Sequence, residues 1–350
     1  MFGWRALKLR RLAGRPQLAV DLGTANTVVY RRGQGVVLFE PSIVAIDERT
    51  GSVYAVGAEA RRMIGRTPAH ISATRPLRDG VIADFEMTEQ MLRHFIRKAT
   101  GGVRLRADVM VCVPSGITGV ERNAVTRAAR AAGATHAFLI EEPMAAAVGA
   151  GLPVAEPRGA MVVDIGGGTT ETAVTALGSL AVVHSIKVGG YQMDDAIVRS
   201  LQLQERLLVG QEQAEALKIE MGSATDSADG GERGEVAGRD LVTGLLRRTS
   251  VSSAQIRAAL QQPLEQIVAA VKDVLDRTPA ELSADLIDQG ITMVGGGALL
   301  SGLDTLLATR TGLPVTVAET PLLTVALGAG QALEELDSLK PQKEHRWTSR

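Results

Sequence analysis

Two short stretches of the chain share one pattern, and this repeat constrains the fold more than any other feature. Residues 19–29 and residues 162–172 each begin with an apolar, β-branched run, continue through an aspartate and a turn of small or hydroxyl residues, and end in a second β-rich run. That order is typical of a β-hairpin. Because the pattern occurs twice, we expect two related half-domains that face each other.

The residue types in the two hairpins predict a phosphate site. Small residues let backbone N–H groups approach an anion closely, and the positions concerned are Gly23, Thr24, Ala25, Asn26, Gly166, Gly167, Gly168 and Thr169. Asp21 and Asp164 end the preceding strands, where their oxygens could hold Mg²⁺ directly or through water. Either aspartate alone could be an ordinary turn residue, but the matched pair favours two loops that clamp one nucleotide.

Composition limits the classes of function. The chain has 350 residues, of which 45% are hydrophobic, enough for a sizeable core and two lobes. A net charge of −1 and 3% aromatic residues give little basis for nucleic-acid binding. The single cysteine, Cys112, excludes an intrachain disulfide and fits a reducing cytoplasm. The sequence contains no run of 18 apolar residues, so it predicts no membrane-spanning helix.

The N-terminal extension, residues 1–17, has an unusual charge pattern. It carries five basic side chains and no acidic one, interleaved with Phe2, Trp4 and three leucines. A helix of this composition would be basic and amphipathic, which suits an anionic membrane surface. A solvated terminal segment is the alternative.

Strand and helix patterns alternate along the rest of the chain. This alternation predicts an α/β fold, with ligand sites at strand ends between the lobes. The expected elements include helices over 87–99 and 211–221, strand material over 174–188, a surface loop over 223–233, a long helical region over 252–278 interrupted near Pro263, and a strand over 291–294.

Glu142 lies just before a proline, at the start of a predicted helix. A carboxylate there is often only a favourable helix N-terminal charge. Alternatively, it could orient or deprotonate the water that attacks a γ-phosphate. Thr169 and Glu171 on the second hairpin are candidates to assist it.

Two further positions also leave alternatives open. Glu215 and Lys218 are three residues apart on a predicted helix, so they could form a surface ion pair or contact ribose and adenine. Gly295, Gly296 and Gly297 follow a strand and could be a simple turn. The helix expected after them could also present its N-terminus to a phosphate or ribose.

Nine motifs resemble the MreB family of bacterial actins, which includes Mbl-like proteins. They occur in the expected order and span residues 18–336, nearly the whole chain. The motifs lie at residues 21–27, 40–42, 79–84, 113–118, 141–147, 164–171, 218–223, 238–244 and 295–300.

The resemblance implies an actin-like ATPase fold, with two lobes each built on a βββαβα-type half carrying inserted subdomains. We expect the lobes at 18–157 and 158–336, with a charged tail over 337–350 and ATP–Mg²⁺ in the central cleft. The resemblance further implies a cytoplasmic protein that polymerises into antiparallel double filaments at the inner membrane face. Such filaments organise cell-wall synthesis, with membrane proteins as partners, and maintain cell shape.

Site roles are carried over motif by motif. Asp21 and Asp164 fall in the Mg²⁺ positions of the family, and Thr24 falls in a phosphate loop, as do Gly166 to Gly168. Gly295 to Gly297 fall in the adenosine loop. Glu142 and Thr169 fall where the family positions the hydrolytic water, which implies a slow ATPase coupled to filament dynamics.

Two departures from the family pattern stand out. Arg106 occupies a place in the loop over 101–106 where a second apolar, membrane-inserting residue is expected, so attachment rests more on the extension. Residues 226–233 stand where the family has a more structured segment.

A soluble kinase of the same superfamily is the main alternative function, although no separate acceptor-binding insertion is evident. A nucleotide-binding scaffold with negligible hydrolysis is another.

Overall fold

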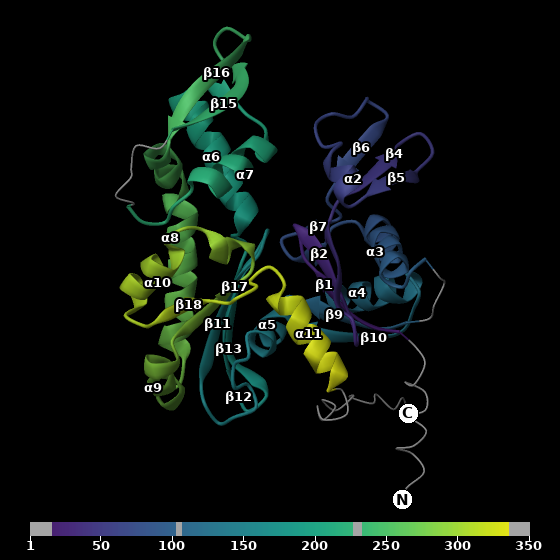
Figure 1. The fold of residues 1–350 in the computed structure, drawn as a ribbon, viewed down its shortest axis with the longest axis vertical. Helices are drawn as coiled ribbons and strands as arrows, with labels where there is room; N and C mark the ends of the chain where they lie inside the picture. The colour runs from purple at the N-terminus through teal and green to yellow at the C-terminus, as the bar shows by residue number, and fades with distance from the viewer. Residues whose placement is uncertain (1–15, 103–106, 227–232, 336–350) are drawn as a thin grey trace, which may run out of the picture.

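Two lobes lie side by side in the computed structural model, which describes residues 16–102, 107–226 and 233–335 (Figure 1). Each lobe contains a five-stranded sheet and a smaller three-stranded sheet. Strands and helices alternate along the chain, which confirms the predicted α/β class. Among the described helices, none has the length and apolar character needed to cross a bilayer.

The two five-stranded sheets have the same topology. In the first, β1, β2 and β3 are antiparallel, and β9 and β10 run parallel to β1. In the second, β11, β12 and β13 are antiparallel, and β17 and β18 run parallel to β11. Both predicted hairpins therefore form. The strands are β1 (Gln17–Leu22), β2 (Asn26–Arg31), β3 (Gly35–Pro41), β9 (Ala107–Val113), β10 (Ala134–Glu141), β11 (Ala160–Ile165), β12 (Thr170–Ala176), β13 (Ser179–Ile186), β17 (Ile291–Val294) and β18 (Val315–Val317).

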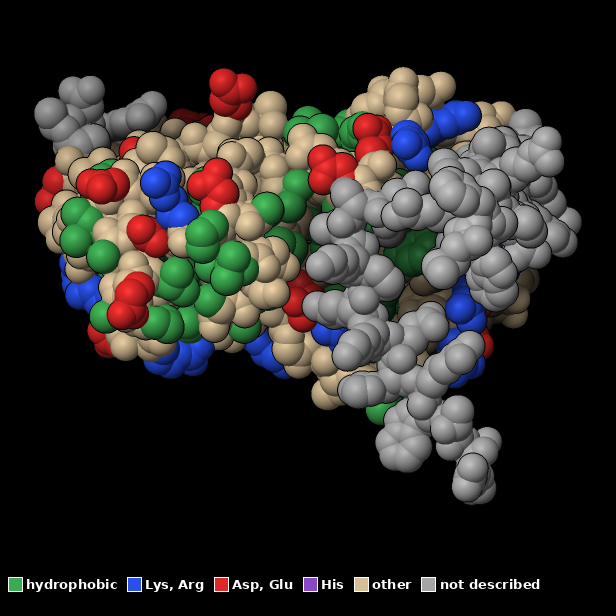
Figure 2. Space-filling model, turned by 90° about the horizontal axis from the view of Figure 1, so that it is seen from below, with side chains coloured by type: hydrophobic (Ala, Val, Ile, Leu, Met, Phe, Trp, Pro, Cys, Tyr) green, Lys and Arg blue, Asp and Glu red, His purple; other side chains and the backbone are tan. Residues whose placement is uncertain are grey.

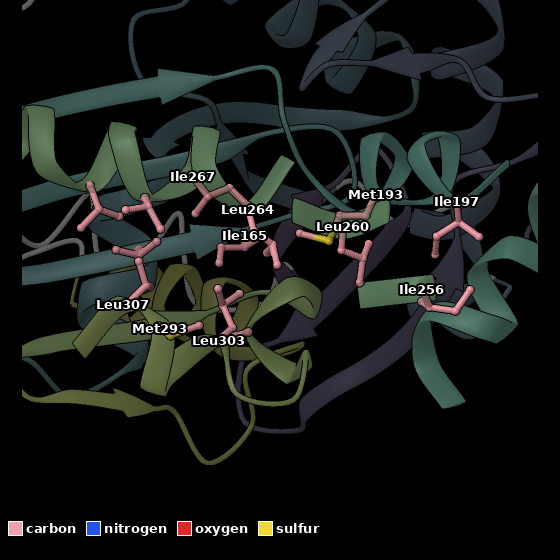
Figure 3. Packing of buried hydrophobic residues seen from close by; sticks show 14 of the residues in the cluster. Ile165, Met193, Ile197, Ile256, Leu260, Leu264, Ile267, Met293, Leu303 and Leu307 are labelled. Carbon is pink, nitrogen blue, oxygen red and sulfur yellow. The ribbon is translucent and has the colours of Figure 1, made fainter. Parts of the chain in front are cut away.

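Helices cover the outer faces of these sheets and complete the two main cores. The first core joins α3 (Phe85–Ala99) and α4 (Gly119–Ala131) to the first sheet. The second core joins α8 (Ser253–Arg277), α9 (Ala280–Gln289) and α10 (Leu303–Thr311) to the second sheet. Figure 3 shows part of this second core, where Leu264 of α8 and Leu303 of α10 belong to the same cluster as Ile165 of β11.

Helix α8 runs without a break through Pro263, so the predicted interruption is wrong. A proline inside a helix costs about 3 kcal/mol because one backbone hydrogen bond is lost and the ring crowds the preceding turn. Leu260, Leu264 and Ile267 around it are all buried. Each such side chain contributes roughly 1.5–3 kcal/mol, so burial on the second sheet outweighs the cost of the proline.

Two helices rich in small residues lie between the sheets. Helix α5 (Glu142–Gly149) packs against α11 (Thr324–Glu334), and α11 also contacts β1 (Figure 1). Their backbones approach so closely that a Cβ on Gly328 would lie 1.8 Å from the carbonyl oxygen of Ala145. The predicted boundary after residue 157 places α11 in the second lobe, although this helix packs directly on the first sheet.

A smaller sheet extends each lobe beyond its five-stranded sheet. In the first lobe the added elements are β4 (Val44–Asp47), β5 (Ser52–Val56), α2 (Ala58–Arg61), β6 (Ile71–Thr74) and the hairpin of β7 (Leu77–Arg78) and β8 (Val81–Ile82). In the second they are α6 (Gly190–Gln204), β14 (Leu207–Leu208), α7 (Gln211–Met221), β15 (Arg233–Asp240) and β16 (Leu246–Ser252).

One local prediction needs correction, and two others lack detail that the structure adds. The strand material expected over 174–188 is divided by a turn at Leu177 and Gly178, both with positive φ. The expected loop over 223–233 ends where β15 begins, and the β15–β16 hairpin was not predicted; residues 227–232 lie outside the described part of the chain. The glycine turn after β17 leads into a short 3₁₀ helix, Gly296–Leu299, before α10.

Candidate functional site

A cavity of about 440 Å³ between the lobes brings nearly all of the predicted site residues together. Gly168 does not line it, and instead lies behind the cavity wall against Thr24. The predicted residues that do line the cavity are Asp21, Gly23, Thr24, Ala25, Asn26, Glu142, Asp164, Gly166, Gly167, Thr169, Glu215, Lys218, Gly295, Gly296 and Gly297.

The first loop, between β1 and β2, is held by groups outside its own hairpin. Ser42 donates its backbone N–H to the carbonyl oxygen of Ala25 (2.9 Å) and its hydroxyl to that of Gly23 (2.6 Å). The hydroxyl of Thr24 accepts a hydrogen bond from the Gly80 N–H (3.0 Å), in the β7–β8 turn. These contacts fix the loop before any ligand binds.

The second loop, between β11 and β12, is held by α6. Gly190 and Tyr191, at the start of that helix, donate their N–H groups to the carbonyl oxygens of Gly166 (3.0 Å) and Gly167 (2.8 Å). A Cβ on Gly167 would lie 2.6 Å from the Cβ of Ala25 in the first loop. Only glycine fits there, so the two loops touch across the boundary between the lobes.

Three carboxylates, those of Asp21, Glu142 and Asp164, line the cavity, and Glu171 lies opposite Asp164 in the β11–β12 hairpin. Burial raises the pKa of Asp21 to about 7 and, together with the charge of Asp21, raises the pKa of Asp164 to about 7. Burial also raises the pKa of Glu142 well above its usual range, and the charges of Glu171, Asp21 and Asp164 add to that increase. So much buried negative charge favours a bound cation.

Glu171 is held by the first lobe although it belongs to the second. It accepts hydrogen bonds from the hydroxyl (2.8 Å) and the backbone N–H (3.0 Å) of Ser115. Burial raises the pKa of Glu171 to about 7 in spite of these bonds, which act in the opposite direction. The carboxylate group therefore links the lobes beneath the cavity.

The donor set fits Mg²⁺ that arrives with a nucleotide. Across the described residues, no three histidine, cysteine, aspartate or glutamate side chains converge into a complete metal cage. Mg²⁺ keeps several waters and takes one or two carboxylates together with substrate phosphates. Asp21 and Asp164, one from each lobe, could supply those carboxylates, and the ion would neutralise charge on the phosphates.

Glu215 and Lys218 do not pair with each other, so the surface ion-pair interpretation is wrong. The ammonium group of Lys218 contacts a carboxylate oxygen of Asp194 (2.7 Å) and the carbonyl oxygen of Gly190 (3.0 Å). Glu215 pairs instead with Arg61 of the first lobe (2.6 Å). Both Glu215 and Lys218 also line the cavity, so the contact with ribose and adenine stays a prediction.

Several lining residues were missed by sequence reasoning. Asp194 of α6 is buried, and burial raises its pKa to about 6 even though Lys218 opposes the shift. The apolar side of the cavity includes Ile219, Leu299 and Leu322, which suits the face of a base. The glycine pair at the start of α6, Gly189 and Gly190, was the available signal for Asp194, since it indicates a close approach to the second loop.

The buried aspartates predict a pH-dependent stability for the nucleotide-free protein. Between pH 4 and about 7 the folded protein binds more protons at Asp21 and Asp164 than the unfolded chain, whose aspartates have a pKa near 3.8. The free energy of unfolding should therefore fall as pH rises through that window. Asp164→Asn should flatten the fall and add up to about 4 kcal/mol of stability at pH 8, because each pKa unit corresponds to about 1.4 kcal/mol. Urea unfolding at several pH values measures the free energy of unfolding. Asp276→Asn on the surface of α8 is the control. If the free energy of unfolding of Asp164→Asn falls with pH as steeply as that of the unmodified chain, the raised pKa of Asp164 is contradicted.

Comparison with known proteins agrees with this geometry over nearly the whole chain. A sequence model of the family described as MreB/Mbl protein matches residues 15–341. The cell shape-determining protein Mbl of Bacillus subtilis (strain 168) is 48% identical over 327 residues, covering 93% of this chain and 98% of the relative. The cell shape-determining protein MreB of Escherichia coli (strain K12) is 51% identical over 326 residues, covering 91% and 94%.

Solved structures show the same architecture. The crystal structure of MreB5 of Spiroplasma citri bound to ADP matches with a TM-score of 0.88 at 36% identity, covering 93% of this chain and 99% of that one. The same protein bound to AMPPNP also gives 0.88, at 37% identity. A MamK double helical filament shares the fold, with a TM-score of 0.79 at 22% identity and coverage of 92% and 99%. The chain has the actin-like fold and belongs to the MreB/Mbl family.

Proposed function

We propose that this chain is an ATP-binding, filament-forming bacterial actin homologue with slow ATPase activity, which organises cell-wall synthesis and maintains cell shape. The observation that carries the proposal is the contact of two phosphate-type loops, one from each lobe, over a single cavity with buried carboxylates. The relatives named as cell shape-determining proteins support it. So do the related structures bound to ADP and AMPPNP.

Each group has a distinct role in this proposal. Asp21 and Asp164 hold Mg²⁺, and the backbone N–H groups of the two loops bind the phosphates. Glu142 begins α5 and points its carboxylate into the cavity, where it orients the attacking water and accepts its proton. Thr169 helps to position that water. Closure of the lobes brings the water into line with the γ-phosphate.

Apolar side chains at opposite ends of the second lobe support self-assembly. The β15–β16 turn exposes Val242, Leu245 and Leu246, the last to 89%. At the other end of this lobe lie α9 and the turn after β12 (Figure 1), where Ile287 and Leu177 are exposed. Seen from below, hydrophobic side chains gather on this lobe (Figure 2). Two different apolar surfaces at the two ends favour a head-to-tail contact, which repeats to build a filament.

Glu142→Ala tests the hydrolytic role. We expect phosphate release from ATP to fall at least tenfold, because positioned general bases contribute about 10²–10⁴-fold, while binding of a fluorescent ATP analogue is retained. Unchanged phosphate release would favour the nucleotide-binding scaffold. Phosphate transfer to a sugar or acid would favour the kinase.

Leu246→Glu tests the apolar contact between subunits. A charge at this position should abolish ATP-dependent sedimentation and leave nucleotide binding intact, because a buried unpaired carboxylate is costly. Val120→Glu is the matched control, since Val120 is also exposed but lies on α4 of the first lobe. Equal sedimentation of the two variants would contradict the proposed contact.

Contact with the inner membrane face rests on the sequence, because the extension before residue 16 and the loop over 103–106 lie outside the described residues. We expect the full chain to pellet with anionic vesicles in ATP and Mg²⁺, and a chain that begins after residue 17 to pellet with them much less. If the full chain and the shortened chain both form filaments and pellet equally with the vesicles, the extension is not the anchor. Capture of membrane proteins of wall synthesis by vesicle-bound filaments would identify the partners.

A further inference from the structure

Three arginines of the first lobe reach across the mouth of the cavity. Arg61 ends α2, Arg66 follows it, and Arg75 follows β6. All three side chains contact the second lobe, on α6 or α7. Figure 1 shows α2 and α7 facing each other from the two lobes.

Two of the contacts are ion pairs with one face of α7. A guanidinium nitrogen of Arg61 lies 2.6 Å from a carboxylate oxygen of Glu215, and one of Arg66 lies 3.1 Å from a carboxylate oxygen of Glu212. The two acidic residues are three apart, so they lie on the same side of the helix. Because the four side chains are partly exposed, these pairs are individually weak and sensitive to salt.

The third contact reaches the second phosphate loop. The Arg75 guanidinium donates to the hydroxyl of Tyr191 (2.9 Å) and lies over its ring, 4.6 Å from the centroid. The backbone N–H of Tyr191 in turn donates to the carbonyl oxygen of Gly167 (2.8 Å). Closure at the mouth is thereby connected to the loop that touches Ala25 of the first lobe.

We propose that Arg61, Arg66 and Arg75 form a latch that holds the lobes closed over the nucleotide and sets the rate at which nucleotide leaves. The inference rests on the proposed function for the identity of the ligand. Glu215 and Tyr191 line the cavity themselves, so the latch contacts are made with side chains that border the ligand site. The three arginines are positioning residues, since they act through α6 and α7.

The distance between the lobes tests the latch without any nucleotide. Fluorophores on Tyr54→Cys of β5 and Leu246→Cys of β16 report that distance, because both side chains are exposed and the native Cys112 is buried. Arg66→Glu should shift the population toward the open form by two- to fivefold, and the combination of Arg66→Glu with Glu212→Arg should restore it. Arg62→Glu changes the net charge equally beside the latch and should leave the distance unchanged.

Nucleotide release is the second measurement. Dissociation of a fluorescent ADP analogue should be two- to fivefold faster in Arg66→Glu than in the unmodified chain. It should return to the unmodified rate when Arg66→Glu is combined with Glu212→Arg. The rate should depend less on salt when Arg61→Ala and Arg66→Ala are combined. A distance between the lobes that is unchanged in Arg66→Glu, or that changes by the same amount in Arg62→Glu, would overturn the proposed latch. If the distances respond as expected but no nucleotide binds, the latch stands and the proposed function fails.

Discussion

Four carboxylates between the two lobes, two of them buried and two half-buried, form the interaction on which the rest of this structure depends. Asp21 and Asp164 end equivalent strands, Glu142 begins α5, and Glu171 lies opposite Asp164 in the β11–β12 hairpin. Their mutual repulsion and desolvation make the empty cavity electrostatically unfavourable. A cation that brings phosphates with it would remove that penalty, and in the proposed function this couples binding to closure of the lobes.

The surrounding structure brings these groups together. Duplicated sheets place one phosphate-type loop on each lobe, and the small-residue helices α5 and α11 let the lobes approach closely. Ser115 joins the lobes below the cavity through Glu171, and the latch arginines join them at its mouth. Contacts between the lobes therefore flank the cavity on two sides.

Local patterns in the sequence predict much of this arrangement, whereas long-range pairings remain hidden. The two hairpins, the aspartates and six of the nine cavity-lining glycines follow from residue type and order. The pairing of Lys218 with Asp194, and of Arg61 with Glu215, depends on how distant helices approach, which no local pattern encodes. Pro263 shows the same limit, because burial on the second sheet overrides its local preference to end a helix.

The central claim is that the two aspartates bind a nucleotide through Mg²⁺. Calorimetric titration of ATP into the purified chain, with Mg²⁺ and then with a chelator, tests it most directly, with Asp21→Asn and Asp164→Asn alongside. The account predicts one site per chain, affinity that depends on Mg²⁺, and at least a tenfold loss in each variant while both remain folded. Binding that is equally tight without Mg²⁺, or unchanged in both variants, would contradict it.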